Sequence, residues 1–167
     1  MSGLTQQPKA RTKHQGGFSL IELLIVVAVI LIIAAIAIPN FIRSKMRANE
    51  TSAVQNLRII TTANVIYLTT YGHGFASTLA KLGGNSVLVD STAAGLIDSV
   101  LSAGSKSGYS FSYTPTTTDS TGAVMGYTVN AQPMTVGSTG DRYFYVDQTC
   151  IIRQNTTGVA GLGDPPI

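Results

Sequence analysis

The chain opens with a short polar stretch and then becomes strongly apolar. Residues 18–38 read FSLIELLIVVAVILIIAAIAI, a run of 21 residues interrupted only by Ser19 and Glu22. As a helix this run would rise about 31 Å at about 1.5 Å per residue, which matches the hydrocarbon thickness of a bilayer. The pattern therefore predicts a transmembrane helix over residues 18–38.

The apolar pattern continues at helical spacing beyond this run, while the positions between become polar. Glycines at 72 and 74 then supply a stop, and His73 between them is expected to be a turn residue. We predict one helix over residues 18–71, with an amphipathic continuation in residues 39–74 that must bury its stripe. The stripe consists of Met46, Ala53, Leu57, Ile60, Tyr67 and Tyr71.

Residues 75–167 change from mixed spacing to a period of two, and we predict that they form a globular region. A short helix is expected within residues 92–103, and the tail at 158–167 is expected to be flexible or clamped. Three or four antiparallel strands are predicted at YSFSYT from Tyr109, MGYTVNA from Met125, RYFYVD from Arg142 and CIIR from Cys150. The predicted fold class is α+β, a long amino-terminal helix packed on a small antiparallel sheet.

Charge adds little to the folded part of the chain. The net charge is +3, but three basic residues precede residue 18, which leaves eight residues of each sign after it. Nucleic-acid binders carry their positive charge on the folded domain, so no nucleic-acid partner is predicted. The short group Arg43, Lys45 and Arg47 follows the apolar run directly, and we interpret it as a solvated or headgroup-facing collar.

The side chains that support catalysis are scarce. The two histidines lie in the leader and in a predicted turn, the acidic residues are scattered, and no glycine-rich phosphate loop is present. Cys150 is the single cysteine, which excludes an intramolecular disulfide and a metal site built from several thiolates. We predict a buried, inert thiol at this position and no enzymatic activity.

Glu22 is the unusual residue of the apolar run. A carboxylate in such a span costs roughly 2–4 kcal/mol and requires a partner, but residues 18–42 contain no Lys, Arg or His. Cleavage after Gly17 would create an α-amino group on Phe18, four residues away. Glu22 would then pair within its own chain or capture the amine of a neighbouring subunit, and only the second pairing would set the register between identical helices.

Two other interpretations remain for this segment. An ordinary signal peptide would use Ala35 and Ala37 as an A-x-A cleavage site, although its core would be long and would contain Glu22. A plain signal anchor would explain the span, but not the carboxylate or the Gly-Phe junction.

The string GFSLIELL at residues 17–24, followed by the apolar stretch and Pro39, resembles the amino terminus of type IV pilins and type II secretion pseudopilins. The resemblance covers about residues 14–60. It implies that residues 1–17 are a leader, that a prepilin peptidase cuts after Gly17 and methylates Phe18, and that Glu22 docks subunits. It also implies a kink at Pro39, where the helix lacks a backbone donor.

The resemblance further implies a structural subunit that assembles with copies of itself into a helical filament. Its partners would be the peptidase and the inner-membrane assembly machinery. The precursor would lie in the bacterial inner membrane with its leader in the cytoplasm, and the assembled form in an extracellular pilus. The alternatives are a type II secretion pseudopilin, in a periplasmic pseudopilus, and a membrane-anchored binding module.

Two features depart from the family pattern. Many type IV pilins pin their carboxy-terminal loop with a cysteine pair, whereas this chain has Cys150 alone. Asp141 and Asp147 faintly resemble the calcium-holding loop of major pseudopilins, but no set of spaced ligands accompanies them. We therefore predict no cofactor and no metal, with calcium as the alternative.

Overall fold

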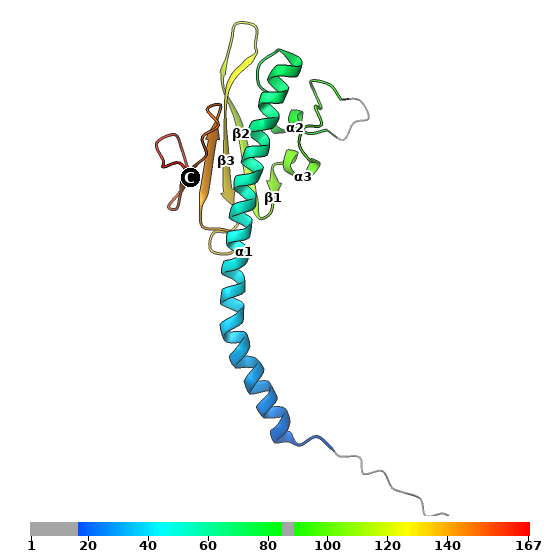
Figure 1. The fold of residues 1–167 in the computed structure, drawn as a ribbon, viewed down its shortest axis with the longest axis vertical. Coiled ribbons are helices and arrows are strands. Elements are labelled where there is room, and N and C mark those ends of the chain that lie inside the picture. Colours follow the sequence, from blue (N-terminus) through cyan, green and yellow to red (C-terminus); the bar gives the residue numbers. More distant parts are fainter. Residues whose placement is uncertain (1–16, 85–88) are drawn as a thin grey trace, which may run out of the picture. The chain divides into compact units, whose positions relative to one another are not determined.

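The computed structural model describes residues 17–84 and 89–167, so the predicted leader lies outside the described residues except for Gly17. The chain divides into two compact units, Met1–Pro39 and Asn40–Ile167. The helices are α1 (Leu20–Tyr71), α2 (Leu79–Leu82) and α3 (Ser99–Ser102), and the strands are β1 (Ser105–Lys106), β2 (Tyr109–Thr118), β3 (Val124–Pro133), β4 (Tyr143–Asp147) and β5 (Arg153–Asn155) (Figure 1).

Helix α1 confirms the predicted long helix and begins two residues later than expected. It continues through Pro39, which has no N–H to donate to the preceding turn. It ends at Tyr71 because Gly72 adopts a φ of 67°, and its N–H donates to the Leu68 carbonyl at 3.0 Å. This is the left-handed glycine cap that terminates many helices. The kink at Pro39 stays a prediction.

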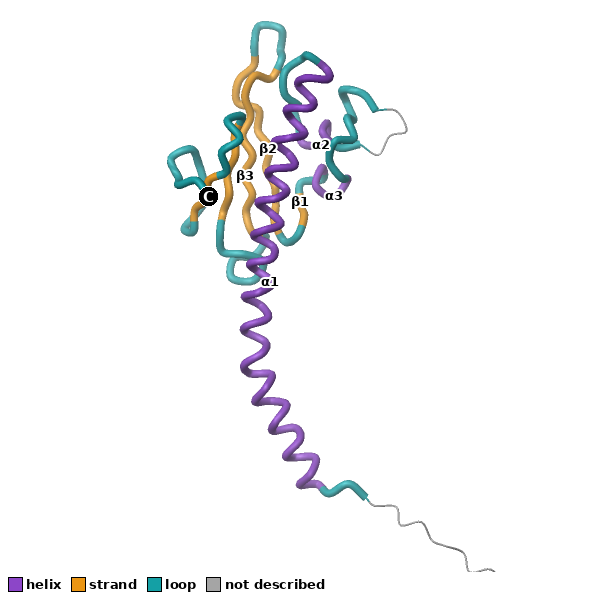
Figure 2. Tube along the Cα trace, viewed as in Figure 1, coloured by secondary structure: helices purple, strands orange, loops and turns teal. Residues whose placement is uncertain are grey.

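The five strands form one antiparallel sheet in the order β1-β2-β3-β4-β5, so that each strand pairs with its neighbour in sequence (Figure 2). Phe111 pairs with Ala131, and Tyr145 pairs with both Asn130 and Arg153. The structure confirms the α+β class and the period-two strands at Tyr109, Met125 and Arg142. Strand β1 was not predicted, because two residues are too few to show an alternation.

The short helix expected within residues 92–103 is confirmed as α3, although it excludes Leu96 and Ile97, whose spacing had pointed to a helix. Only α3 is helical there, and Leu96 and Ile97 instead donate their N–H groups to the Leu82 carbonyl at 2.8 and 3.1 Å. Gly95, with a φ of 62°, turns the backbone before this segment, and Asp98 then caps the helix by accepting the N–H of Leu101. The short helix α2 carried no periodic signal.

The predicted strand at Cys150 is wrong, as is the predicted burial of its thiol. Cys150 has a φ of 65° and is exposed. It belongs to a turn that Asp147 closes: the Asp147 carbonyl accepts the N–H of Cys150 at 3.0 Å, and its carboxylate accepts the N–H of Thr149 at 2.9 Å. Strand β5 begins only at Arg153.

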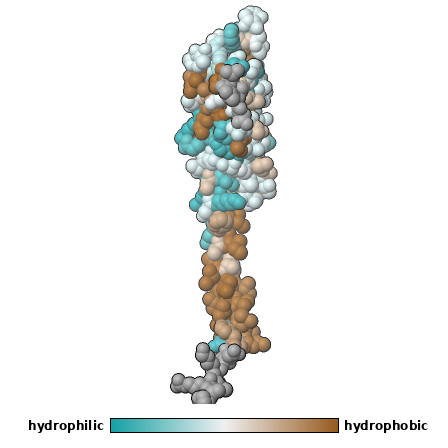
Figure 3. Space-filling model, turned by 90° about the vertical axis from the view of Figure 1, so that its right-hand side faces the viewer, coloured by the Kyte–Doolittle hydropathy of each residue, from teal (hydrophilic) through white to brown (hydrophobic). Residues whose placement is uncertain are grey.

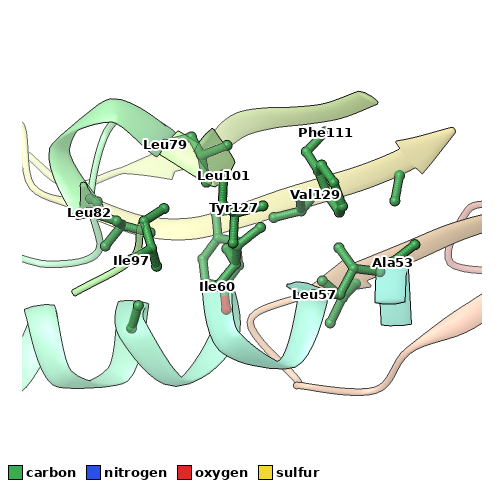
Figure 4. Close-up of a cluster of buried hydrophobic side chains, with 14 of the residues drawn as sticks. Ala53, Leu57, Ile60, Leu79, Leu82, Ile97, Leu101, Phe111, Tyr127 and Val129 are labelled. Carbon is green, nitrogen blue, oxygen red and sulfur yellow. The ribbon is translucent and has the colours of Figure 1, made fainter. Parts of the chain in front are cut away.

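The core lies between the second half of α1 and one face of the sheet. The predicted stripe residues Ala53, Leu57 and Ile60 are fully buried. Fully burying a leucine or isoleucine contributes about 1.5–3 kcal/mol, so this stripe is a large part of what attaches the helix. The facing and flanking residues are Leu79, Leu82, Ile97, Leu101, Phe111, Tyr127 and Val129 (Figure 4).

A polar pair lies inside this apolar core and was not predicted. Asn64 is fully buried, and its Oδ1 accepts the N–H of Ala76 at 3.3 Å. The Tyr113 hydroxyl lies 3.0 Å from the same oxygen and 2.7 Å from the Ala76 carbonyl. Burial raises the pKa of Tyr113, which keeps this hydroxyl protonated as a donor. The pair fixes the loop after α1 to strand β2.

The carboxy-terminal tail is clamped, which was one of the two expectations. The N–H of Gln154 donates to the Pro165 carbonyl at 3.0 Å, and that of Ile167 donates to the Ile152 carbonyl at 3.1 Å. The Arg153 guanidinium donates to the Asp164 carbonyl at 2.8 Å. Hydrogen bonds to β5 and to Ile152 therefore fix the tail. A disulfide within the chain cannot do so, because the chain has a single cysteine.

Three aspartates in the Asn40–Ile167 unit accept local backbone hydrogen bonds and have lowered pKa values. The main cause is a bond from a threonine hydroxyl for Asp90 and Asp119, and from the Lys106 ammonium for Asp98. A carboxylate with a lowered folded pKa stabilises the fold fully above its unfolded pKa of about 4, and that stability is lost as pH falls through the folded value.

We expect the midpoint of thermal unfolding to stay nearly constant between about pH 7 and 5 and to fall below about pH 4. Asp98→Asn should flatten this fall slightly, because the amide no longer titrates while its oxygen still accepts the N–H of Leu101. Differential scanning calorimetry of the full chain in a non-ionic detergent measures both. A midpoint that rises on acidification would contradict the expectation.

Candidate functional site

The start of α1 contains the residues that the sequence singled out. Gly17, Phe18 and Ser19 precede the helix, and the Ser19 carbonyl accepts its first bond from the N–H of Leu23 at 3.2 Å. The carboxylate Oε2 of Glu22 accepts the N–H of Ser19 at 2.8 Å. This is one half of a capping box, in which an acidic residue in the first turn satisfies a donor that the helix leaves free.

The Gly17–Phe18 peptide bond lies outside the helix and is accessible. Gly17 is exposed, and a Cβ added to it would meet nothing within 4 Å. Phe18 is 79% exposed. Chain cleavage at this bond would therefore leave the hydrogen bonds of α1 intact and place a new amine one residue before the helix cap.

The first half of α1 presents apolar side chains on all sides. From Phe18 to Ile42 the exposed fractions of the large hydrophobic residues lie between 41% and 80%. Among the described residues, α1 is the one helix long and apolar enough to cross a membrane, and its most apolar window is not buried by the rest of the chain. Space-filling colours show this apolar surface over the amino-terminal part of α1 (Figure 3). A surface of this size requires lipid or protein to cover it.

The structure does not bring the two aspartates of the calcium hypothesis into a common ligand set. Asp141 accepts the N–H of Gly137 at 3.0 Å, and Asp147 is engaged by Tyr145 and Thr149 in its own turn. Within residues 17–84 and 89–167, no group of three or more His, Cys, Asp or Glu side chains is arranged to hold a metal ion.

Glu50 and Arg142 form an ion pair that the sequence analysis missed. The Glu50 side chain is 8% exposed, and its Oε2 accepts the Nε–H of Arg142 at 2.8 Å. Its Oε1 accepts the backbone N–H groups of Asp141 and Arg142 at 3.0 and 3.3 Å. Glu50 lies between Met46 and Ala53 on the predicted stripe, so an acidic residue on an apolar face was the available signal.

Other contacts also join α1 to the segment before β4. Together with the Glu50–Arg142 ion pair, they are called the latch below. The Arg142 guanidinium donates to the Gln154 side chain at 3.0 Å and lies 5.4 Å from the centre of the Phe144 ring. The Asn49 amide donates to the Thr139 carbonyl at 2.9 Å. The latch therefore joins the first buried turn of α1 to the last two strands.

Comparisons with known proteins find one family and two relatives that match part of the chain. Residues 12–38 match the family described as the prokaryotic N-terminal methylation motif. A type IV major pilin protein, PilA, of Myxococcus xanthus is 57% identical over 47 residues, or 28% of this chain and 21% of that protein. A type IV wide pilus major component of Thermus thermophilus, PilA4, is 54% identical over 39 residues, or 23% of this chain and 30% of that protein.

The matched stretches thus span less than a third of either relative, and no solved structure matches the chain. The family match nevertheless falls on the segment that holds the Gly17–Phe18 junction, Glu22 and the exposed apolar helix. That helix continues into an antiparallel sheet domain, as the resemblance in the sequence implied. The chain is therefore similar to type IV pilins over part of its length, and its long helix packed with an antiparallel sheet is pilin-like.

Proposed function

We propose that the chain is the structural subunit of a type IV pilus. Both relatives are described as major pilus components, and the methylation-motif match covers the first half of the helix that would form the filament core. The observation that carries the proposal is the apolar surface of residues 18–42, which the described part of the chain leaves uncovered. In the precursor this surface would be covered by lipid, and in the filament by the same surface of neighbouring subunits.

Processing would begin at the accessible Gly17–Phe18 bond. A prepilin peptidase cuts there in this proposal and methylates the amine of Phe18. The precursor lies in the inner membrane with its leader in the cytoplasm, and the assembly machinery then transfers the subunit into the extracellular filament. The proposal includes no catalytic activity, cofactor or metal for the chain itself.

Glu22 would set the register between subunits. One of its oxygens, Oε2, already accepts the N–H of Ser19, whereas Oε1 makes no hydrogen bond within the described part of the chain. A carboxylate has enough acceptor sites for both a backbone donor and an ammonium group. The same residue can therefore cap its own helix and accept the Phe18 amine of a neighbouring subunit, which supports the docking role.

The first test is the intact mass and amino-terminal sequence of the protein from membranes and from sheared surface filaments. We expect a chain that begins at methylated Phe18 in both fractions. A chain that begins at Ile38 would contradict the proposal, because it would indicate an ordinary signal peptide cut after Ala37. Processed protein confined to the cell envelope and stabilised by calcium would indicate a pseudopilin instead. An uncut chain with no filaments would favour a membrane-anchored binding module.

A further inference from the structure

A positively charged hollow of about 430 Å³ lies in the Asn40–Ile167 unit, beside the first turns of α1 in that unit. Arg43 and Arg47 are four residues apart, so they lie on one face of the helix, and both are exposed. The complete lining is Arg43, Met46, Arg47, Glu50, Asp141 and Arg142.

The carboxylates of the hollow are already engaged. Glu50 accepts three hydrogen bonds, two of them from Arg142, and Asp141 accepts the N–H of Gly137. Within the described residues, Arg43 and Arg47 form no ion pair. Three guanidinium groups thus accompany two carboxylates in the lining, and the two that form no ion pair within the described residues belong to Arg43 and Arg47 on the helix. This arrangement suits an anion that accepts several N–H bonds.

The place of the hollow along α1 identifies which anion it meets. Arg43 follows Ile38, the last residue of the apolar run, by five positions, which is about 8 Å of helix. The interfacial layer on each side of the hydrocarbon core is about 5–8 Å thick. In a membrane-inserted precursor, Arg43 therefore lies at the depth of the lipid phosphates, and Arg47 lies about one helical turn further out on the same face of α1.

These arginines also oppose the membrane orientation that the basic residues of the leader favour. Basic residues retain their flank in the cytoplasm, and the three in the leader (Lys9, Arg11 and Lys13) are matched by three just after the span (Arg43, Lys45 and Arg47). A cationic outer flank weakens the orientation that the proposed function requires. An anionic partner on the outer side of the membrane would offset this unfavourable contribution.

We propose that this hollow binds the phosphate of an anionic phospholipid in the outer leaflet of the inner membrane before the subunit is assembled. The inference rests on the membrane insertion in the proposed function, but not on filament formation. The lipid would fix the depth and rotation of α1 in the bilayer. Extraction of the subunit into a filament would then require exchange of this lipid for other anions or water.

The test uses the full chain in a neutral detergent, with phosphatidylglycerol or phosphatidylcholine added and bound lipid counted by native mass spectrometry. We expect retention of phosphatidylglycerol over phosphatidylcholine. The double variant Arg43→Gln/Arg47→Gln should weaken phosphatidylglycerol binding roughly 10- to 30-fold, since each arginine near an anionic surface contributes about fivefold.

Arg58→Gln is the matched control, because Arg58 is an exposed arginine on the same helix and does not line the hollow. It should leave binding unchanged. Equal retention of the two lipids, or an equal loss in Arg58→Gln, would overturn the proposal. Displacement of the lipid by millimolar inorganic phosphate would overturn it as well, because the hollow would then be a site for a soluble anion.

The detergent assay separates this inference from the proposed function. A chain that binds phosphatidylglycerol but is never found with methylated Phe18 would refute the pilin proposal alone. A processed chain that forms filaments but shows no lipid preference would refute the lipid site alone. Unfolding midpoints of the variants within about 1 °C of the parent would show that the surface substitutions leave the fold intact.

Discussion

Glu22→Ala is expected to abolish surface filaments while the precursor is still inserted and cut after Gly17. The alanine removes the one charge of the apolar span and the bond to the Ser19 N–H, which is 2.8 Å long in the parent. Membrane insertion should improve, because a carboxylate in the span costs roughly 2–4 kcal/mol. Electron microscopy of cells, together with immunoblots of membrane and sheared fractions, measures both outcomes.

Glu22→Gln separates the two roles of this side chain. Glutamine can still accept the Ser19 N–H in a capping box, so the start of α1 should remain intact. It carries no charge and cannot form an ion pair with the Phe18 amine of a neighbouring subunit. We therefore expect Glu22→Gln to fail in assembly as Glu22→Ala does. Normal filaments in the glutamine variant would show that capping, and not charge, is what assembly requires.

Glu50→Ala is expected to lower the free energy of unfolding by about 2–4 kcal/mol. Breaking a buried ion pair on one side costs about 3–5 kcal/mol, and the partial exposure of Arg142 (38% of its side chain) reduces this figure. The variant also leaves the backbone N–H groups of Asp141 and Arg142 without their acceptor. Denaturant unfolding of the full chain in detergent, followed by circular dichroism, measures the loss.

Two further variants calibrate this prediction. Glu50→Gln keeps an oxygen that accepts the backbone N–H groups, but it has no negative charge to pair with Arg142. It should lower the free energy of unfolding by about 1–2 kcal/mol. Lys106→Ala breaks the exposed pair with Asp98 and should cost less than about 1 kcal/mol. A cost for Glu50→Ala no larger than that for Lys106→Ala would show that the latch contributes little to stability.

Much of the fold could be predicted because single elements carried strong periodic patterns. The apolar run and the stripe through Leu57 predicted α1, and the alternation of Tyr109, Phe111 and Tyr113 predicted β2. These patterns depend on which face of an element is buried, which local sequence encodes directly. Gly72 marked the end of α1 for a similar reason, since a positive φ favours glycine.

The errors fall where a turn or a tertiary contact overrides the local pattern. CIIR has the composition of a strand, but the carboxylate of Asp147 closes a turn that places Cys150 at a positive φ. Leu96 and Ile97 have helical spacing with Leu101, but hydrogen bonds to α2 hold them outside α3. Asp98, rather than the apolar spacing, sets where that helix begins.

The candidate site also contains one feature that could be predicted from the sequence and one that could not. Glu22 was identifiable because a lone carboxylate in an apolar run is costly whatever its surroundings. Its bond to Ser19 follows from the spacing of a capping box alone, whereas the residues of the span had suggested an ionic partner. Arg142 could not be assigned to Glu50, because the two residues are 92 positions apart and many cations were equally eligible.

The neighbour-to-neighbour order of the sheet has a consequence for the order of folding. Each hairpin closes from residues that leave the ribosome close together, whereas Asn49 meets Thr139 across 90 positions. Ribosomes add roughly 5–20 residues per second, so the 90 residues between these positions take about 5–20 s to synthesise. During this time the strands that cover α1 are not yet complete. For a chain exported as proposed, a half-made subunit thus exposes its α1 stripe to other nascent copies during this interval. If neighbouring copies are exported at different times, their exposed stripes would not pair with each other.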